Sequence, residues 1–230
     1  MDRCQVYENF LYVAALAAAC CVLVPVKLNE SDTNGNCLLF AELNVLTNTV
    51  ATGNNIFCSL AFYAYLVNAA LAAVLGFLKS CCIVTTERLS AVYFLFASSI
   101  VSALVWISCL VYTIFIVIGL TEWCNSVENN GNVESCKDAE KWDWTLFSPT
   151  GIDGSKFYTH LFMAEIASIA SVVIWFIILI LSGRNFKQSL LNVRAAEYYL
   201  NEERMSYMYP PPIQDIPVYE VKSDGGSRFL

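Results

Sequence analysis

Residues 110–136 read LVYTIFIVIGLTEWCNSVENNGNVESC, an apolar run that changes into a polar stretch containing two cysteines. The apolar run begins near residue 91, so its length meets the roughly 20 residues that a helix needs to cross a bilayer. Another apolar run, IASVVIWFIILIL at 169–181, follows the polar stretch. The pattern predicts two membrane-spanning helices joined by a polar loop.

Apolar runs of this kind recur along the chain of 230 residues, near 10–26, 57–78, 91–120 and 161–181. No segment outside them is larger than a loop or a tail. Only 14% of the residues are charged, compared with about 25% in an ordinary soluble domain. We therefore expect an all-α membrane protein, built as a bundle of four transmembrane helices.

The first run also resembles the apolar region of a cleaved signal peptide, because Arg3 precedes an alanine-rich stretch. Such a region is usually only about 7–15 residues long, whereas this run continues through CCVLV at 20–24. The length favours a retained span, and the next loop is translocated in either case.

The distribution of lysine and arginine predicts the orientation, since these residues accumulate in cytoplasmic loops. With cytoplasmic termini, the inner segments 1–9, 79–90 and 182–230 hold nine such residues, and the outer loops 27–56 and 121–160 hold four. The clearest contrast is Arg184, Lys187 and Arg194, directly after the fourth run. We expect both termini in the cytoplasm, in the plasma membrane or an endomembrane.

The predicted outer side holds four cysteines, an even number that suits disulfides in an oxidising compartment: Cys37, Cys58, Cys124 and Cys136. We favour two local pairs, Cys124 with Cys136 and Cys37 with Cys58. The strongest rival joins the two loops to each other. A local pair in the second loop would hold the third span against KDAEKWDW at 137–144, where Trp142 and Trp144 can anchor at the membrane interface.

Two kinds of modification site are candidates. Cys81 and Cys82 lie at the inner end of the second span, where cysteines are candidates for palmitoylation. The alternative is a pair of small apolar residues that end a helix. Asn29 begins the glycosylation sequon Asn29-Glu30-Ser31, which suits an outer loop, but it lies close to the end of the apolar run.

The cytoplasmic tail is predicted to have two parts. Residues 183–208 contain no proline and continue the fourth span as a helix. YPPP at 209–212 ends that helix, and the residues beyond it have little to bury. We expect the tail to be partly disordered.

The sequence offers little catalytic chemistry. His160 is the single histidine, and the GxSxG, HExxH and glycine-rich phosphate motifs are missing. Glu165 lies within the fourth span, where a carboxylate is a candidate functional group; near the interface it can instead reach water or pair with His160. We expect no catalytic, cofactor-binding or metal-binding residues, and no enzymatic activity.

The motifs GNCLLF at 35–40, FCSLAF at 57–62 and WC…SC at 123–136 resemble the transmembrane protein 179 family. The resemblance covers about 180 residues, from the first span to the end of the fourth. It implies a four-span topology rather than a mechanism. Sequences of this family often have an uncharged amide near the position of Glu165, which implies that a carboxylate is not essential there.

Three functions are compatible with these features. The first is an accessory or trafficking partner of another integral membrane protein, such as a channel or receptor, with membrane lipids as its other contacts. The second is a self-assembling pore or junction protein, for which Ser98, Ser102 and Thr113 give only a thin polar stripe. The third is a transporter or membrane enzyme built around Glu165 and His160. A homo-oligomer is possible, and a pure one would support the second function; we expect no binding of nucleic acid.

Overall fold

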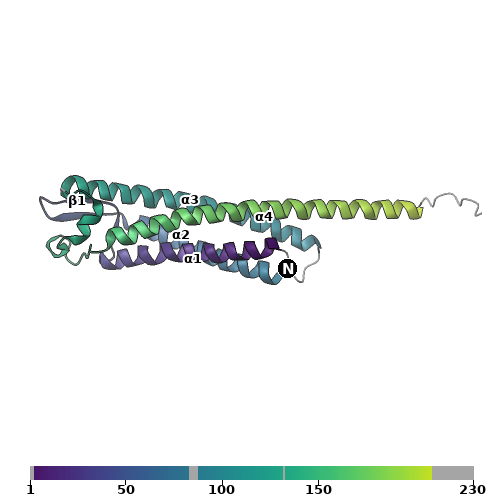
Figure 1. Ribbon diagram of the computed structural model, residues 1–230, viewed down its shortest axis with the longest axis horizontal. Coiled ribbons are helices and arrows are strands. Elements are labelled where there is room, and N and C mark those ends of the chain that lie inside the picture. Colours follow the sequence, from purple (N-terminus) through teal and green to yellow (C-terminus); the bar gives the residue numbers. More distant parts are fainter. Residues whose placement is uncertain (1–2, 83–87, 132, 209–230) are drawn as a thin grey trace, which may run out of the picture. The chain divides into compact units, whose positions relative to one another are not determined.

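The computed structural model describes residues 3–82, 88–131 and 133–208 (Figure 1). The chain divides into two compact units, Met1–Gln188 and Ser189–Leu230. The elements in chain order are α1 (Arg3–Asp32), β1 (Cys37–Asn44), β2 (Thr49–Gly53), α2 (Asn55–Cys82), α3 (Arg88–Gly131), η1 (Cys136–Lys141), η2 (Trp144–Leu146) and α4 (Phe157–Met208). The first unit ends within α4.

The four α-helices are each long and apolar enough to cross a membrane. Their apolar segments are Tyr7–Asp32, Asn55–Ser80, Val92–Gly131 and Phe157–Leu200. Each segment covers all or nearly all of one predicted span and extends beyond it. The predicted fold, a mostly helical protein with four candidate membrane spans, is confirmed.

Helices α1, α2 and α4 each bury a stripe of residues that are alternately three and four positions apart. In α4 the stripe consists of Phe157, Leu161, Ala164, Ser168, Ser171, Trp175, Ile178 and Ser182. This alternation is the 3.5-residue repeat of coiled coils, which keeps one seam of a helix against its neighbours. The spans of the first unit therefore pack as a helix bundle.

The bundle has polar groups inside and apolar groups outside. Ser168 and Ser171 are fully buried in the seam of α4, whereas Ile169 and Val173 on its other face are exposed. A helix at the surface of a soluble protein has the opposite pattern. Exposed apolar faces match the hydrocarbon of a bilayer, and buried polar side chains join helices there. The chain is a multi-pass membrane protein.

Polar contacts link three helices at the centre of the bundle. The Asn68 Nδ2 group of α2 donates to Cys109 Sγ of α3 at 3.1 Å, and Ser171 Oγ of α4 lies 3.6 Å from the same sulfur. The hydroxyl groups of Tyr65 and Thr113 are 3.1 Å apart. These contacts give Asn68 the packing role that polar residues often have between membrane helices.

A small hairpin covers one end of the bundle. Strands β1 and β2 are antiparallel, with Leu43 opposite Val50. Ser148 of the second loop extends the sheet, because the Val50 amide donates to Ser148 O at 2.8 Å and the Ser148 amide donates to Asn48 O at 2.8 Å. We call the part formed by β1, β2, η1, η2 and the adjoining helix ends the loop end.

The second unit contains residues 189–208 of α4, whose tyrosines Tyr198 and Tyr199 are exposed. The described part of the helix extends to Met208, directly before the YPPP segment that the sequence predicts as its end. The predicted disordered tail lies outside the described residues.

Candidate functional site

Two disulfides hold the loop end together. Cys37 is joined to Cys58, 21 residues away, and Cys124 is joined to Cys136, 12 residues away. The first bond ties the start of β1 to α2, and the second ties α3 to η1. These are the two local pairs that the sequence favours, and each loop is closed on its own neighbouring helix.

The stretch WCNSVENNG at 123–131 is the last part of helix α3 rather than a loop. Trp123 and Val127 are fully buried, and Leu120 three residues earlier is also buried. This helical spacing of apolar residues was present in the sequence, but the polar residues between them obscured it. Cys124 is therefore held on a rigid helix, which extends the third span into the loop end.

An aromatic cluster forms the core of the second loop. The rings of Trp142 and Phe147 stack at 5.9 Å between centroids, and Trp144 packs against both Phe147 and Phe157. Trp123 lies edge-on to Phe157 at 5.7 Å. The aromatic rings thus join α3, the second loop and the start of α4.

The prediction that Trp144 anchors at the membrane interface was wrong. This residue is buried, and its indole N–H donates to Ala139 O at 3.0 Å inside the loop core. Trp142 is half-buried against Gly131, where an added Cβ would lie 2.3 Å from the Trp142 ring. Tryptophan's large apolar area serves here to fill the core of the loop.

Helix α3 also holds the hairpin. The Leu43 amide donates to Ser126 Oγ at 2.8 Å, and Asn130 Nδ2 donates to Leu43 O at 2.8 Å. Side chains of α3 thus bond the backbone groups of Leu43 at the edge of β1 that faces away from β2. The sequence analysis missed this hairpin, although the alternation from Ala41 to Asn44 and the turn-forming TNT at 47–49 were available signals.

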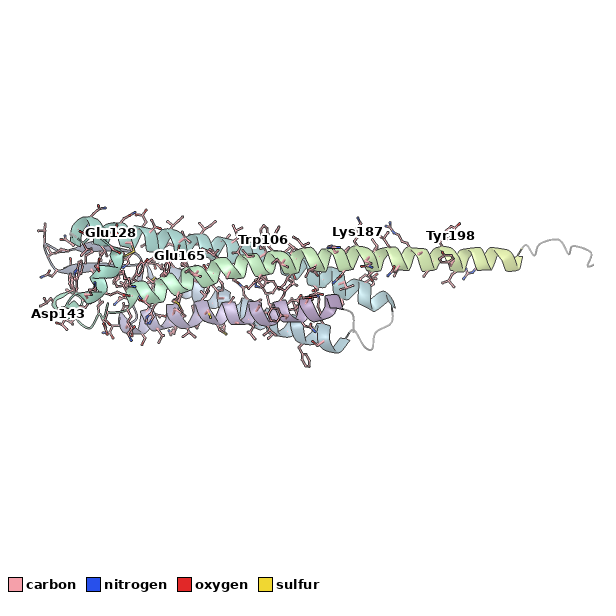
Figure 2. The ribbon with its side chains drawn as sticks, viewed as in Figure 1. Trp106, Glu128, Asp143, Glu165, Lys187 and Tyr198 are labelled. Carbon is pink, nitrogen blue, oxygen red and sulfur yellow. A yellow bond between two sulfur atoms is a disulfide. The ribbon has the colours of Figure 1, made fainter. Side chains whose placement is uncertain are left out.

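The surface of the loop end has two hollows. A groove of about 1260 Å³ runs between β1 and α3, and a smaller pocket of about 300 Å³ lies beside the second loop. Leu46 at the hairpin tip and Leu146 in η2 are 98% and 66% exposed. Figure 2 shows Glu128 and Asp143 at this end of the first unit.

Buried charges occur at the other end of the bundle. Lys79 of α2 donates to a carboxylate oxygen of Glu8 in α1, and Asn185 of α4 donates to the other at 3.0 Å. The Lys79 ammonium also lies 5.4 Å from the centre of the Tyr12 ring, within cation–π range. Glu8 and Lys79 fall in the predicted inner segments 1–9 and 79–90, yet both are buried in the bundle.

His160 and Glu165 do not form a pair. His160 Nδ1 lies 3.5 Å from a carboxylate oxygen of Asp32 in α1, so it connects the start of α4 to the end of α1. Glu165 is half-buried on α4, one turn further along (Figure 2). Among the described residues, no group of three or more His, Cys, Asp or Glu side chains is placed to hold a metal ion.

The candidate modification sites lie in helices. Asn29 is 2% exposed in the last turns of α1, so this fold leaves no space for a glycan on its amide. Cys81 and Cys82 are the last residues of α2. Their side chains lie outside the described part of the chain, and palmitoylation there stays a prediction.

Comparison with known proteins identifies the family of this chain. The model of the family "Transmembrane protein 179/179B Claudin domain" matches residues 4–206. Human Transmembrane protein 179B is 25% identical over 198 residues, which is 84% of this chain and 88% of that protein. No solved structure matches the chain. The family match spans all four helices and both disulfides, and the chain therefore belongs to the transmembrane protein 179/179B claudin-domain family.

Proposed function

We propose that this protein is a non-enzymatic accessory or trafficking partner of another integral membrane protein, such as a channel or receptor, and that its loop end is the recognition surface. The observation that carries the proposal is an ordered loop end with exposed leucines. Two disulfides and an aromatic core fix the backbone there, while Leu46 and Leu146 remain exposed beside the two hollows.

Order in the loop end supports binding because a preorganised surface loses little conformational entropy when a partner docks. Leu46 lines one hollow and Leu146 the other, so a partner that enters the hollows would bury both side chains. The outer faces of the four spans, which are apolar, supply a second contact area within the bilayer. Lipid or a partner helix covers these faces.

The proposal includes an orientation, with both termini in the cytoplasm and the loop end on the outer side. The excess of lysine and arginine in the segments next to the helix ends supports it, as do disulfides in the loop end, since these persist in oxidising compartments. The membrane is the plasma membrane or an endomembrane.

The rival functions have less support. A pore formed between copies needs polar side chains on an outer face, but Ser98 and Ser102 are buried inside the bundle. A transporter built on His160 and Glu165 needs the two residues to cooperate, and His160 is turned to Asp32 instead.

The test is purification of the full-length protein from native tissue in mild detergent, followed by mass spectrometry. The proposal expects one channel or receptor subunit at a fixed ratio to this protein. Replacement of both exposed leucines, Leu46→Ser with Leu146→Ser, should lower that ratio without changing the yield. Leu66→Ser, on the exposed face of α2 within its span, tests the contact area in the bilayer separately from the loop end. A pure homo-oligomer would overturn the proposal.

A further inference from the structure

We propose that the groove between β1 and α3 binds an extended, lysine- or arginine-bearing segment of the partner, next to one of that partner's transmembrane helices. This inference rests on the proposed function and specifies its partner chemistry. The groove is the larger of the two hollows described above for the loop end. It runs along α3 on one side and along β1 and the hairpin tip on the other.

One wall of the groove is a ridge on α3 formed by Ile118, Glu122, Asn125 and Asn129. These residues are three or four positions apart, so they share one face of the helix, and all are exposed. From Ile118 to Asn129 the ridge is about 16 Å long at 1.5 Å per residue. An extended segment of about five residues has the same length.

The opposite wall comes from β1 and the hairpin tip, where Glu42, Asn44 and Leu46 line the groove. Its floor contains Leu43, Ser126 and Asn130, which are bonded to one another. Those bonds fix the distance between the hairpin and α3 at this point. The groove is therefore held open between two connected elements.

The charge of the groove favours a cationic occupant. Glu42 and Glu122 are both exposed there, none of its described lining residues is lysine or arginine, and neither carboxylate belongs to an ion pair in the described part of the chain. The segments 27–56 and 121–160 have net charges of −2 and −4. A basic segment would thus be attracted from a distance and guided into the groove.

The position of Ile118 connects the groove to the bilayer. This residue lies in the apolar run of α3 and is 47% exposed, and it also lines the groove. A partner helix packed beside α3 within the membrane could continue directly into the groove as it leaves the bilayer. The partner segment should therefore be apolar nearest the membrane and basic beyond it.

The smaller pocket adds an anchoring point. Val45 of the hairpin tip lines both this pocket and the groove. Trp142, Leu146 and Phe147 also line the pocket. Its volume of about 300 Å³ is large enough for one large apolar side chain. A buried apolar anchor beside polar contacts is the usual arrangement at the centre of a protein interface.

The experiment uses the full-length protein in cells that express its partner. A photo-crosslinking amino acid replaces Asn129, which lines the groove, or Glu134, which lies outside both hollows. The adduct from position 129 should contain a juxtamembrane peptide of another membrane protein with at least one lysine or arginine. Glu42→Lys with Glu122→Lys should reduce this adduct about tenfold or more, because two attractive contacts become repulsive.

Matched controls separate the possible outcomes. Glu134→Lys, a charge reversal on an exposed loop residue outside the groove, should leave the adduct from Asn129 unchanged. All variants should show the same elution profile as the unmodified protein. An adduct to a partner from position 134 alone would overturn the groove and leave the proposed function standing. No adduct from either position would overturn both, and an adduct to an acidic segment would overturn the charge argument.

Discussion

The ammonium group of Lys79 donates a hydrogen bond to the carboxylate of Glu8, which lies 71 residues earlier in the chain, and both side chains are almost completely buried. Asn185 donates to the second carboxylate oxygen. The three residues come from α2, α1 and α4, so this contact fixes the relative positions of three helices of the first unit.

Removal of one partner should destabilise the bundle strongly, because it leaves the other charge buried without compensation. We expect Lys79→Met to lower the free energy of unfolding by about 3–5 kcal/mol, and Glu8→Met with Lys79→Met together to recover much of this loss. Thermal unfolding in detergent micelles measures both. Lys187→Met, at an exposed position of α4, should have little effect. Equal losses in the single and double variants would contradict a paired buried charge.

A side chain at position 131 should disrupt the second loop. In Gly131→Ala the new Cβ would lie 2.3 Å from the ring of Trp142, so the ring must move and its stacking on Phe147 is disturbed. We expect a loss of about 1–3 kcal/mol and altered tryptophan fluorescence. The control is Gly183→Ala in α4, where nothing lies within 4 Å of the added Cβ. That variant should be neutral or slightly stabilising, since alanine favours a helix.

The disulfide between Cys124 and Cys136 should be needed for delivery to the cell surface. It closes a ring across a separation of 12 residues, a constraint of about 3 kcal/mol in the chain-entropy model. Cys124→Ser and Cys136→Ser should each impair surface delivery, and the double variant should be no worse than either. Peptide mapping without reducing agent should find both local pairs. A crosslink from Cys37 to Cys124 or Cys136 would argue for the rival pairing.

The orientation predicts which tags are accessible. In the proposed orientation, tags at Met1 and Leu230 should be protected from protease in intact cells, because lysine and arginine accumulate on the cytoplasmic side. A tag inserted near Asn130 should be cleaved in the fraction at the surface. Cleavage of the tag at Leu230 would reverse the whole topology.

Glu165 should tolerate loss of its charge. Its side chain is half-buried on α4, and no hydrogen bond or ion pair of its carboxylate occurs in the described part of the structure. Glu165→Gln should therefore leave expression and surface level nearly unchanged. Loss of a measured flux or current in this variant would favour a transporter.

The spans could be predicted from the sequence because hydropathy depends only on composition within a short window. In the loop end the two local disulfide pairs could be predicted, but the packing around them could not. Trp144 looked like an interfacial anchor, since nothing local reveals that Ala139 accepts its N–H or that Phe147 and Phe157 surround it. Glu8 and Lys79 lie just outside the predicted spans, so the sequence placed each in a cytoplasmic segment. Their pairing depends on how α1 and α2 pack, which no single segment encodes.

The local pairing of the cysteines has a consequence for biosynthesis. The chain is made from its N-terminus, and Cys37 and Cys58 both emerge before any residue of α3 exists. The disulfide can thus join the hairpin to α2 before α3 is made. At that stage the backbone groups of Leu43 at the edge of β1 do not yet bond to Ser126 and Asn130. During that interval we expect the edge of β1 that the finished protein hides to be accessible to other proteins. The order of the elements along the chain thus predicts that the loop end matures in steps, with α3 as the last.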